Sequence, residues 1–106
     1  MNGPGAGRLA VVGLGPGDET WRTPEATDRL AAATDLVGYG PYLRQIGFLG
    51  EHQTSHSFPN RKEAERAAFA LDLAASGRDV AIVSSGDPGI FAMATAVVEE
   101  MHKENP

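Results

Sequence analysis

The sequence predicts an α/β protein, in which a three-layer arrangement places helices on both faces of a parallel sheet of about four strands. The apolar runs Leu9–Val12 and Val80–Val83 lack polar alternation, which is typical of strands buried on both faces of a parallel sheet. Strand-length and helix-length segments also alternate along the chain, and this order favours right-handed crossovers between parallel strands.

Length and composition limit the classes of protein. With 106 residues and 42% hydrophobic residues, the chain can form one domain with a single core. A net charge of −5 argues against a nucleic-acid partner, and the absence of cysteine excludes disulfides and thiolate chemistry. No apolar run approaches the roughly 20 residues that span a bilayer, so we expect no membrane partner and a cytoplasmic protein. Residues 1–7 are predicted to be a flexible tail before a domain at 8–106.

The first predicted helix has a complete start pattern. Thr23 can cap it, Pro24 suits the first helical position, and Glu25 adds negative charge to the first turn. We expect this helix to follow the strand Leu9–Val12 and to run to about Ala33.

The middle of the chain is predicted as short elements. A strand is expected at Asp35–Tyr39, and Gly40 with Pro41 should break the chain. A single helical turn around Tyr42–Ile46 and a third strand near Glu51–Ser55 follow.

The second half has the strongest helical periodicity. Alanines and leucines recur at helical spacing between Ala64 and Ala75, Asn60 can cap the start, and Gly77 can end the helix. The strand Val80–Val83 comes next, and a final helix is predicted from Pro88 to about Met101.

Two strands are each followed by a loop rich in glycine. Gly13–Asp18 follows the first strand, and Ser84–Gly89 follows the last, with Asp87 as the predicted N-cap of the final helix. Open α/β sheets bind ligands at the carboxyl ends of their strands. We therefore expect the Gly15–Asp18 and Ser85–Gly89 segments to lie side by side and to form a site.

Several other interpretations of these residues remain open. A dinucleotide fingerprint would need a glycine where Asp18 stands and a helix directly behind the loop, whereas the next helix begins at Thr23. The glycines could also have only a structural role, in a tight turn after the strand, and Asp87 could be only a helix cap.

The remaining charged residues favour structural roles. His52 and His56 have no obvious third ligand nearby, so solvated histidines are favoured over a metal site, and we predict no metal. Arg61, Lys62 and Arg66 share their helix start with glutamates, which favours a solvated face of mixed charge over an anion site.

Taken together, four segments resemble the tetrapyrrole (corrin/porphyrin) methyltransferases, over about Arg8 to Met101. They are Val11–Asp18, Thr23–Ala26, Gly38–Tyr42 and Ser84–Ile90. The Gly-Tyr-x-x-Tyr segment with Ser-Ser-Gly-Asp-Pro-Gly resembles the branch of the family that methylates C17 of precorrin-3B with ring contraction in cobalamin biosynthesis. The chain departs from that branch at Phe91, where a tyrosine is common.

The resemblance implies S-adenosylmethionine as methyl donor, bound in a cleft between two α/β domains. It assigns donor-contacting positions to Pro16, Ser85, Gly86, Asp87 and Ile90. On the substrate side we predict Tyr39 and Tyr42, just beyond a strand end, together with Gly15 and Gly17. No residue is assigned as catalytic.

The chain stops directly after a predicted helix, so we expect the N-terminal domain of a longer methyltransferase, inactive alone. An unpaired sheet edge and an uncovered apolar patch would favour a homodimer. The alternatives are another corrin or porphyrin methylase of the same family, or a non-catalytic nucleotide-binding or interaction domain.

Overall fold

The computed structural model describes residues 7–14, 24–46, 50–59 and 62–104, with the backbone alone for residues 45, 85–90 and 104. Strands and helices alternate within these ranges. In chain order they are β1 (Arg8–Leu14), α1 (Pro24–Ala32), β2 (Asp35–Tyr39), α2 (Gly40–Ile46), β3 (Thr54–Phe58), α3 (Glu63–Ala75), β4 (Asp79–Ser85) and α4 (Gly86–Glu104).

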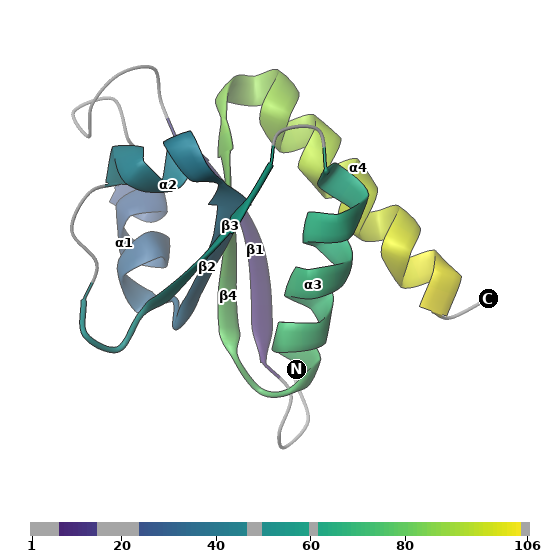
Figure 1. Ribbon diagram of the computed structural model, residues 1–106, viewed down its shortest axis with the longest axis horizontal. Helices are drawn as coiled ribbons and strands as arrows, with labels where there is room; N and C mark the ends of the chain where they lie inside the picture. The colour runs from purple at the N-terminus through teal and green to yellow at the C-terminus, as the bar shows by residue number, and fades with distance from the viewer. Residues whose placement is uncertain (1–6, 15–23, 47–49, 60–61, 105–106) are drawn as a thin grey trace.

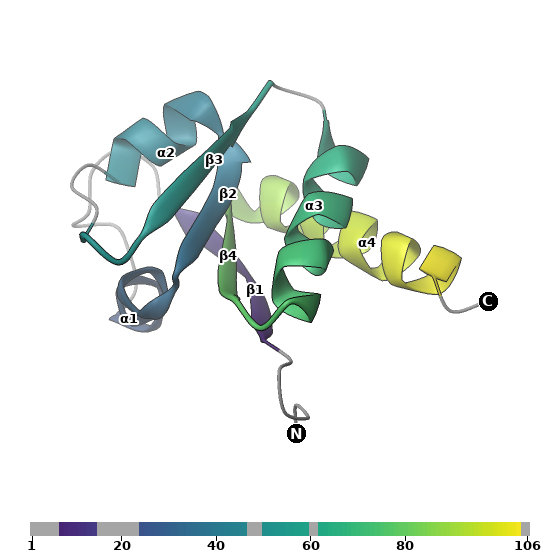
Figure 2. The same ribbon diagram turned by 60° about the horizontal axis from the view of Figure 1, so that its bottom comes forward.

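The sheet has four strands in the order β1-β4-β2-β3, and all neighbouring pairs are parallel. Helices α1 and α2 lie on one face of the sheet, and α3 and α4 lie on the other (Figure 1). The view in Figure 2 shows the same layering, with β3 at the outer edge beside β2. The predicted fold class is therefore confirmed.

The central strand β4 explains why its apolar run does not alternate with polar residues. Ala81 and Val83 face the core beneath α1 and α2, whereas Val80 and Ile82 face the core beneath α3 and α4. Each of these four side chains is at most 2% exposed. A strand covered by helices on both faces needs apolar residues at every position.

Two of the predicted middle elements were wrong in their bounds. Gly40 and Pro41 do not break the chain but begin α2, because a proline in the first helical turn lacks only an N–H that has no partner there. The strand expected near Glu51–Ser55 lies instead at Thr54–Phe58. Contacts with other elements set this register: His56 bonds to Asp35 of β2, and Phe58 packs on α3.

The end of α3 agrees with the prediction from the sequence, whereas the start of α4 does not. Helix α3 stops before Gly77, whose φ of 101° suits a residue without a Cβ, as predicted. Its predicted cap, Asn60, lies outside the described residues, and Lys62 occupies the N-cap position without a side-chain cap. Helix α4 begins already at Gly86, so Asp87 lies in the first turn and is not the N-cap.

Candidate functional site

The carboxyl ends of β1 and β4 lie next to each other. The two strands pair in parallel register throughout, and the last pair joins Leu14 with Ser85. The chain therefore leaves β1 and β4 at one edge of the sheet, which is where the two predicted ligand-binding segments begin. Of these, Gly15, Pro16 and Gly17 lie outside the described residues.

The connection from β4 to α4 contains no loop residue, because the helix begins at Gly86 directly after Ser85. The backbone N–H groups of a first helical turn have no partner within the helix. The predicted donor-side residues Gly86, Asp87 and Ile90 therefore lie on the first turns of α4. These turns stand at the edge where β4 ends, beside the buried Ser84.

The two predicted substrate-side tyrosines are brought together at the same edge. Tyr39 is the last residue of β2, the strand beside β4, and Tyr42 lies in α2. Their rings meet edge to face, with centroids 5.2 Å apart and an angle of 85° between the ring planes. Aromatic pairs prefer this arrangement, which gives each ring a defined orientation.

A polar group beside these tyrosines was missed in the sequence. A Cβ on Gly40 would stand 2.9 Å from the Ser57 hydroxyl oxygen and 3.4 Å from Arg44 Nη1. A side chain at position 40 would therefore displace Ser57 or Arg44, which approach the space that it would fill. The sequence analysis did not predict this contact, because it treated Gly40 as a chain break. In the structure Gly40 begins α2, and one helical turn places Arg44 close to Gly40.

The opposite, amino edge of the sheet holds a closed polar network around Asp35, whose side chain is 3% exposed. Its carboxylate accepts hydrogen bonds from Arg78 Nε at 2.7 Å and Thr34 Oγ1 at 2.8 Å, and lies 2.7 Å from His56 Nε2. Burial raises the pKa of Asp35, but these hydrogen bonds and the charge of Arg78 outweigh it, so the pKa lies below its ordinary value.

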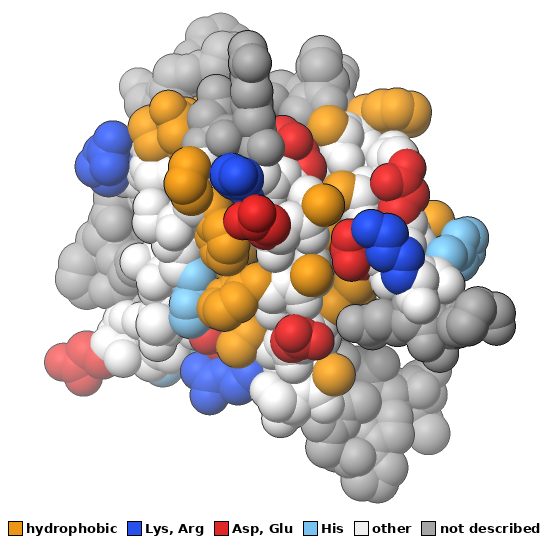
Figure 3. All heavy atoms as spheres, turned by 45° about the vertical axis from the view of Figure 1, so that its right-hand side comes forward, with side chains coloured by type: hydrophobic (Ala, Val, Ile, Leu, Met, Phe, Trp, Pro, Cys, Tyr) orange, Lys and Arg blue, Asp and Glu red, His pale blue; other side chains and the backbone are white. Residues whose placement is uncertain are grey.

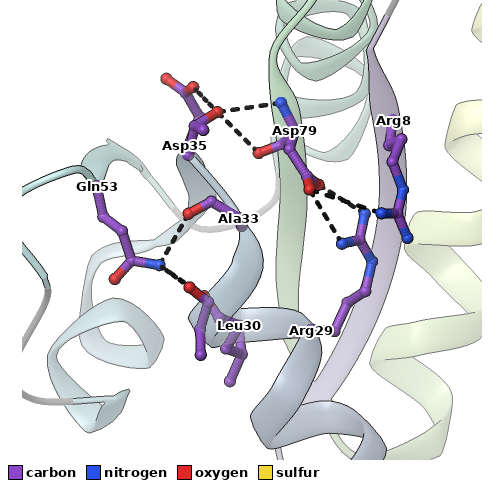
Figure 4. A network of polar contacts seen from close by, with 9 residues as sticks. Arg8, Arg29, Leu30, Ala33, Asp35, Gln53 and Asp79 are labelled. Atoms are coloured by element: carbon purple, nitrogen blue, oxygen red, sulfur yellow. Dashed lines mark hydrogen bonds and ion pairs between the residues drawn. The ribbon is translucent and has the colours of Figure 1, made fainter.

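Asp79 and Gln53 extend this network (Figure 4). The Asp79 carboxylate binds Arg29 at 2.7 Å and lies 4.0 Å from Arg8. The Gln53 amide nitrogen donates to the carbonyls of Leu30 at 2.6 Å and Ala33 at 2.9 Å. Gln53 therefore satisfies backbone groups at the end of α1 that the helix leaves without partners.

The interpretation of charged residues as solvated was wrong for His56 and Arg66, whereas His52 and Lys62 are exposed as expected. His56 is bound to Asp35 and packs on the Phe69 ring, with centroids 4.9 Å apart. Arg66 is buried, and its guanidinium donates to the Pro59 carbonyl at 3.1 Å. Within the described ranges, no group of three His, Cys, Asp or Glu side chains is placed to hold a metal ion.

The sequence matches the family Tetrapyrrole (Corrin/Porphyrin) Methylases over residues 8–106, and the chain belongs to this family. It is 47% identical over 97 residues to the precorrin-3B C(17)-methyltransferase of a Sinorhizobium species, which covers 92% of this chain. It is 56% identical over 94 residues to the cobalamin biosynthesis protein CobIJ of Mycobacterium tuberculosis, which covers 89% of this chain.

Solved structures resemble the chain as well. The crystal structure of the methyltransferase CobJ superposes on 93% of the chain with a TM-score of 0.83 and 53% identity. The cobalt precorrin-4 methyltransferase CbiF superposes on 92% of it with a TM-score of 0.73 at 20% identity, which shows a shared fold.

The relatives are much longer than this chain. It spans 38% of the Sinorhizobium methyltransferase, 18% of CobIJ and 42% of the CobJ structure. Separately, none of the described helices is long and apolar enough to cross a membrane.

Proposed function

We propose that this chain is the N-terminal, donor-binding domain of an S-adenosylmethionine-dependent methyltransferase that methylates C17 of precorrin-3B with ring contraction, in cobalamin biosynthesis. The observation that carries the proposal is the 47% identity, over 92% of this chain, to a protein named for that reaction. Other relatives are named for cobalt-factor III, so the proposed acceptor is a macrocycle of this stage with or without cobalt.

The residues at the carboxyl edge suit such a donor. When bound, S-adenosylmethionine supplies a methyl group on a positively charged sulfur. The protein then has mainly to hold two molecules in line, which contributes much of the rate of such a reaction. Backbone groups at Ser85 and Gly86 and the Asp87 carboxylate could hold the donor, with Pro16 and Ile90 beside it. Gly86 lets a ligand approach the backbone closely.

The acceptor would lie next to the donor along the same edge. Tyr39 and Tyr42 stand one strand away from β4, at the end of β2, and offer two fixed aromatic rings. Gly15 and Gly17 would border the acceptor from the β1 side. A flat macrocycle can pack against aromatic faces without hydrogen bonds of defined direction.

A nuclear magnetic resonance titration tests donor binding. With millimolar S-adenosylhomocysteine, the stable product of the donor, we expect amide shifts at Gly13–Leu14 and Ser84–Ile90. Asp87→Ala should weaken this binding by about 1.5–3 kcal/mol, the range for a hydrogen bond to a charged group. The exposed Asp28→Ala on α1 is the matched control.

An unchanged dissociation constant for Asp87→Ala would mean that this carboxylate only stabilises the start of α4. The loss should then appear in the free energy of unfolding. If the product shifted no amide at this edge, a non-catalytic interaction domain would be favoured.

We also propose that the protein is cytoplasmic and forms a homodimer. Exposed hydrophobic side chains on α4 support the dimer. Phe91 is 75% exposed and Val98 is 50% exposed. Figure 3 shows hydrophobic side chains among charged ones on the side of the molecule that carries α3 and α4. Strand β1 is also an edge of the described sheet. Sedimentation across a concentration series tests this part.

A further inference from the structure

Arg44 differs from the other described arginines in its surroundings. The others each pair with a carboxylate: Arg8 and Arg29 with Asp79, Arg66 with Glu63, and Arg78 with Asp35. Within the described part of the chain no ion pair joins Arg44 to a carboxylate, although Asp and Glu outnumber Lys and Arg by 14 to 9. Its side chain is exposed.

The Arg44 guanidinium lies close to Gly40. The guanidinium reaches back along α2, so that Nη1 stands 3.4 Å from where a Cβ of Gly40 would lie. Gly40 directly follows Tyr39, the last residue of β2. The charge therefore lies at the carboxyl edge of the sheet, near the Ser57 hydroxyl and close to the residue that follows Tyr39.

This combination suits one kind of ligand. A guanidinium binds a carboxylate through two parallel hydrogen bonds, and a hydroxyl beside it can donate a third. The tyrosine rings at the same edge of the sheet offer apolar contact area. A flat ring system with carboxylates on its rim satisfies both parts, and tetrapyrroles with acetate and propionate side chains have this form.

We propose that Arg44 binds a peripheral carboxylate of the macrocyclic acceptor, with Ser57 beside it and the rings of Tyr39 and Tyr42 against the macrocycle. This assignment rests on the proposed function, because it takes the acceptor to be a tetrapyrrole. The donor also carries a carboxylate, on its methionine part. The acceptor is favoured because Arg44 lies over the end of β2, whereas the donor segments follow β1 and β4.

Two titrations of the same samples show whether Arg44 binds a carboxylate of the acceptor or the carboxylate of the donor. Uroporphyrin I, which carries eight carboxylates, serves as the acceptor probe, and S-adenosylhomocysteine serves as the donor probe. Amide shifts from each are followed in the unmodified protein and in Arg44→Gln, Arg44→Lys and Arg8→Gln. Arg8→Gln is the control, because it removes one exposed arginine from the opposite edge.

We expect Arg44→Gln to weaken uroporphyrin binding about tenfold, as the loss of a hydrogen-bonded ion pair at an accessible site implies. Arg44→Lys should recover part of this loss, since lysine keeps the charge but not the paired donors. Arg8→Gln should bind uroporphyrin within about twofold of the unmodified protein, and the donor probe should bind all four proteins equally.

Each other outcome has a definite meaning. Equal uroporphyrin binding by Arg44→Gln and the unmodified protein would overturn the assignment of Arg44, while donor binding at Ser84–Ile90 would leave the proposed function standing. A loss confined to the donor probe would assign Arg44 to the donor carboxylate and overturn the acceptor site. If uroporphyrin binding depends on Arg44 but the donor probe does not bind, the proposed function is contradicted and the assignment of Arg44 stands. A protein that binds neither probe would overturn both.

Discussion

The two edges of the sheet are built from similar residue types but arranged in opposite ways. At the amino edge, Asp35 and Asp79 each bind arginines, and buried polar groups have partners. At the carboxyl edge, β1 and β4 end next to each other, the rings of Tyr39 and Tyr42 meet, and the exposed Arg44 lies close to Gly40. The charged groups at the amino edge bind one another within the fold, whereas the exposed charge at the carboxyl edge is available to a ligand.

This difference predicts that the edges respond differently to substitution. A buried carboxylate that holds several donors contributes to the free energy of unfolding, because its removal leaves those donors without partners. Exposed groups at the other edge contribute little to folding and act on ligand binding. A change at one edge should therefore affect one property and leave the other nearly unchanged.

The largest effect is expected from Asp35→Ala. This substitution removes the common partner of His56, Arg78 and Thr34 and leaves a buried network incomplete. We expect the free energy of unfolding to fall by about 3 kcal/mol in urea denaturation, the lower end of the range for breaking a buried ion pair. The exposed Asp28→Ala should change it by at most about 0.5 kcal/mol. A loss below about 1 kcal/mol for Asp35→Ala would show that the network adds little to stability.

A smaller loss should follow Gln53→Ala. The amide of Gln53 holds the carbonyls of Leu30 and Ala33 and so ties the segment before β3 to the end of α1. Its removal should cost about 1–2 kcal/mol of unfolding free energy, since two partly buried acceptors lose a donor. The neighbouring Glu51→Ala, which is exposed, is the matched control. Equal stabilities of the two variants would contradict this role of Gln53.

The pH dependence of stability sharpens the account of Asp35. Its pKa in the folded protein lies below the ordinary value of 3.8, so the folded state favours the ionised carboxylate. The resulting stabilisation is complete above that ordinary value and is lost as the pH falls through the lower pKa of the folded protein. The difference in unfolding free energy between the unmodified protein and Asp35→Asn should therefore shrink in acid. A difference that stays constant down to pH 2 would contradict this sign.

The smallest effect on stability is expected at the other edge, from Gly40→Ala. The new Cβ would stand 2.9 Å from the Ser57 hydroxyl, which can rotate away, and would displace the Arg44 guanidinium. A gain in helix propensity should offset this cost, so the unfolding free energy should change by less than about 1 kcal/mol. Uroporphyrin binding should nevertheless weaken severalfold. Unchanged binding would show that Gly40 does not define the position of Arg44.

Local patterns accounted for much of the fold. The bounds of β2 and the stop of α3 at Gly77 were predicted correctly, because apolar runs and glycine preferences act within a few residues. The start of β3 was wrong because Gln53 and His56 bind partners more than 20 positions away, Leu30 and Asp35. No local pattern reports such a contact.

The same reasoning applies to the site. Tyr39 and Tyr42 were predicted from their place after a strand, and the structure brings their rings together. Arg44 could not be found in this way, because the absence of a partner is a property of the folded surface. The burial of Arg66 was missed for a related reason: its position among charged residues in the sequence says nothing of the α3–α4 interface.

The most direct test of the difference between the edges measures two quantities on two variants. Unfolding free energy and the dissociation constant for S-adenosylhomocysteine are determined for Asp35→Ala and Asp87→Ala under conditions where both remain folded. The account predicts a large loss of stability with unchanged binding for Asp35→Ala. For Asp87→Ala it predicts weaker binding with a stability change of at most about 1 kcal/mol. Parallel losses of both quantities in both variants would contradict a division of roles between the two edges.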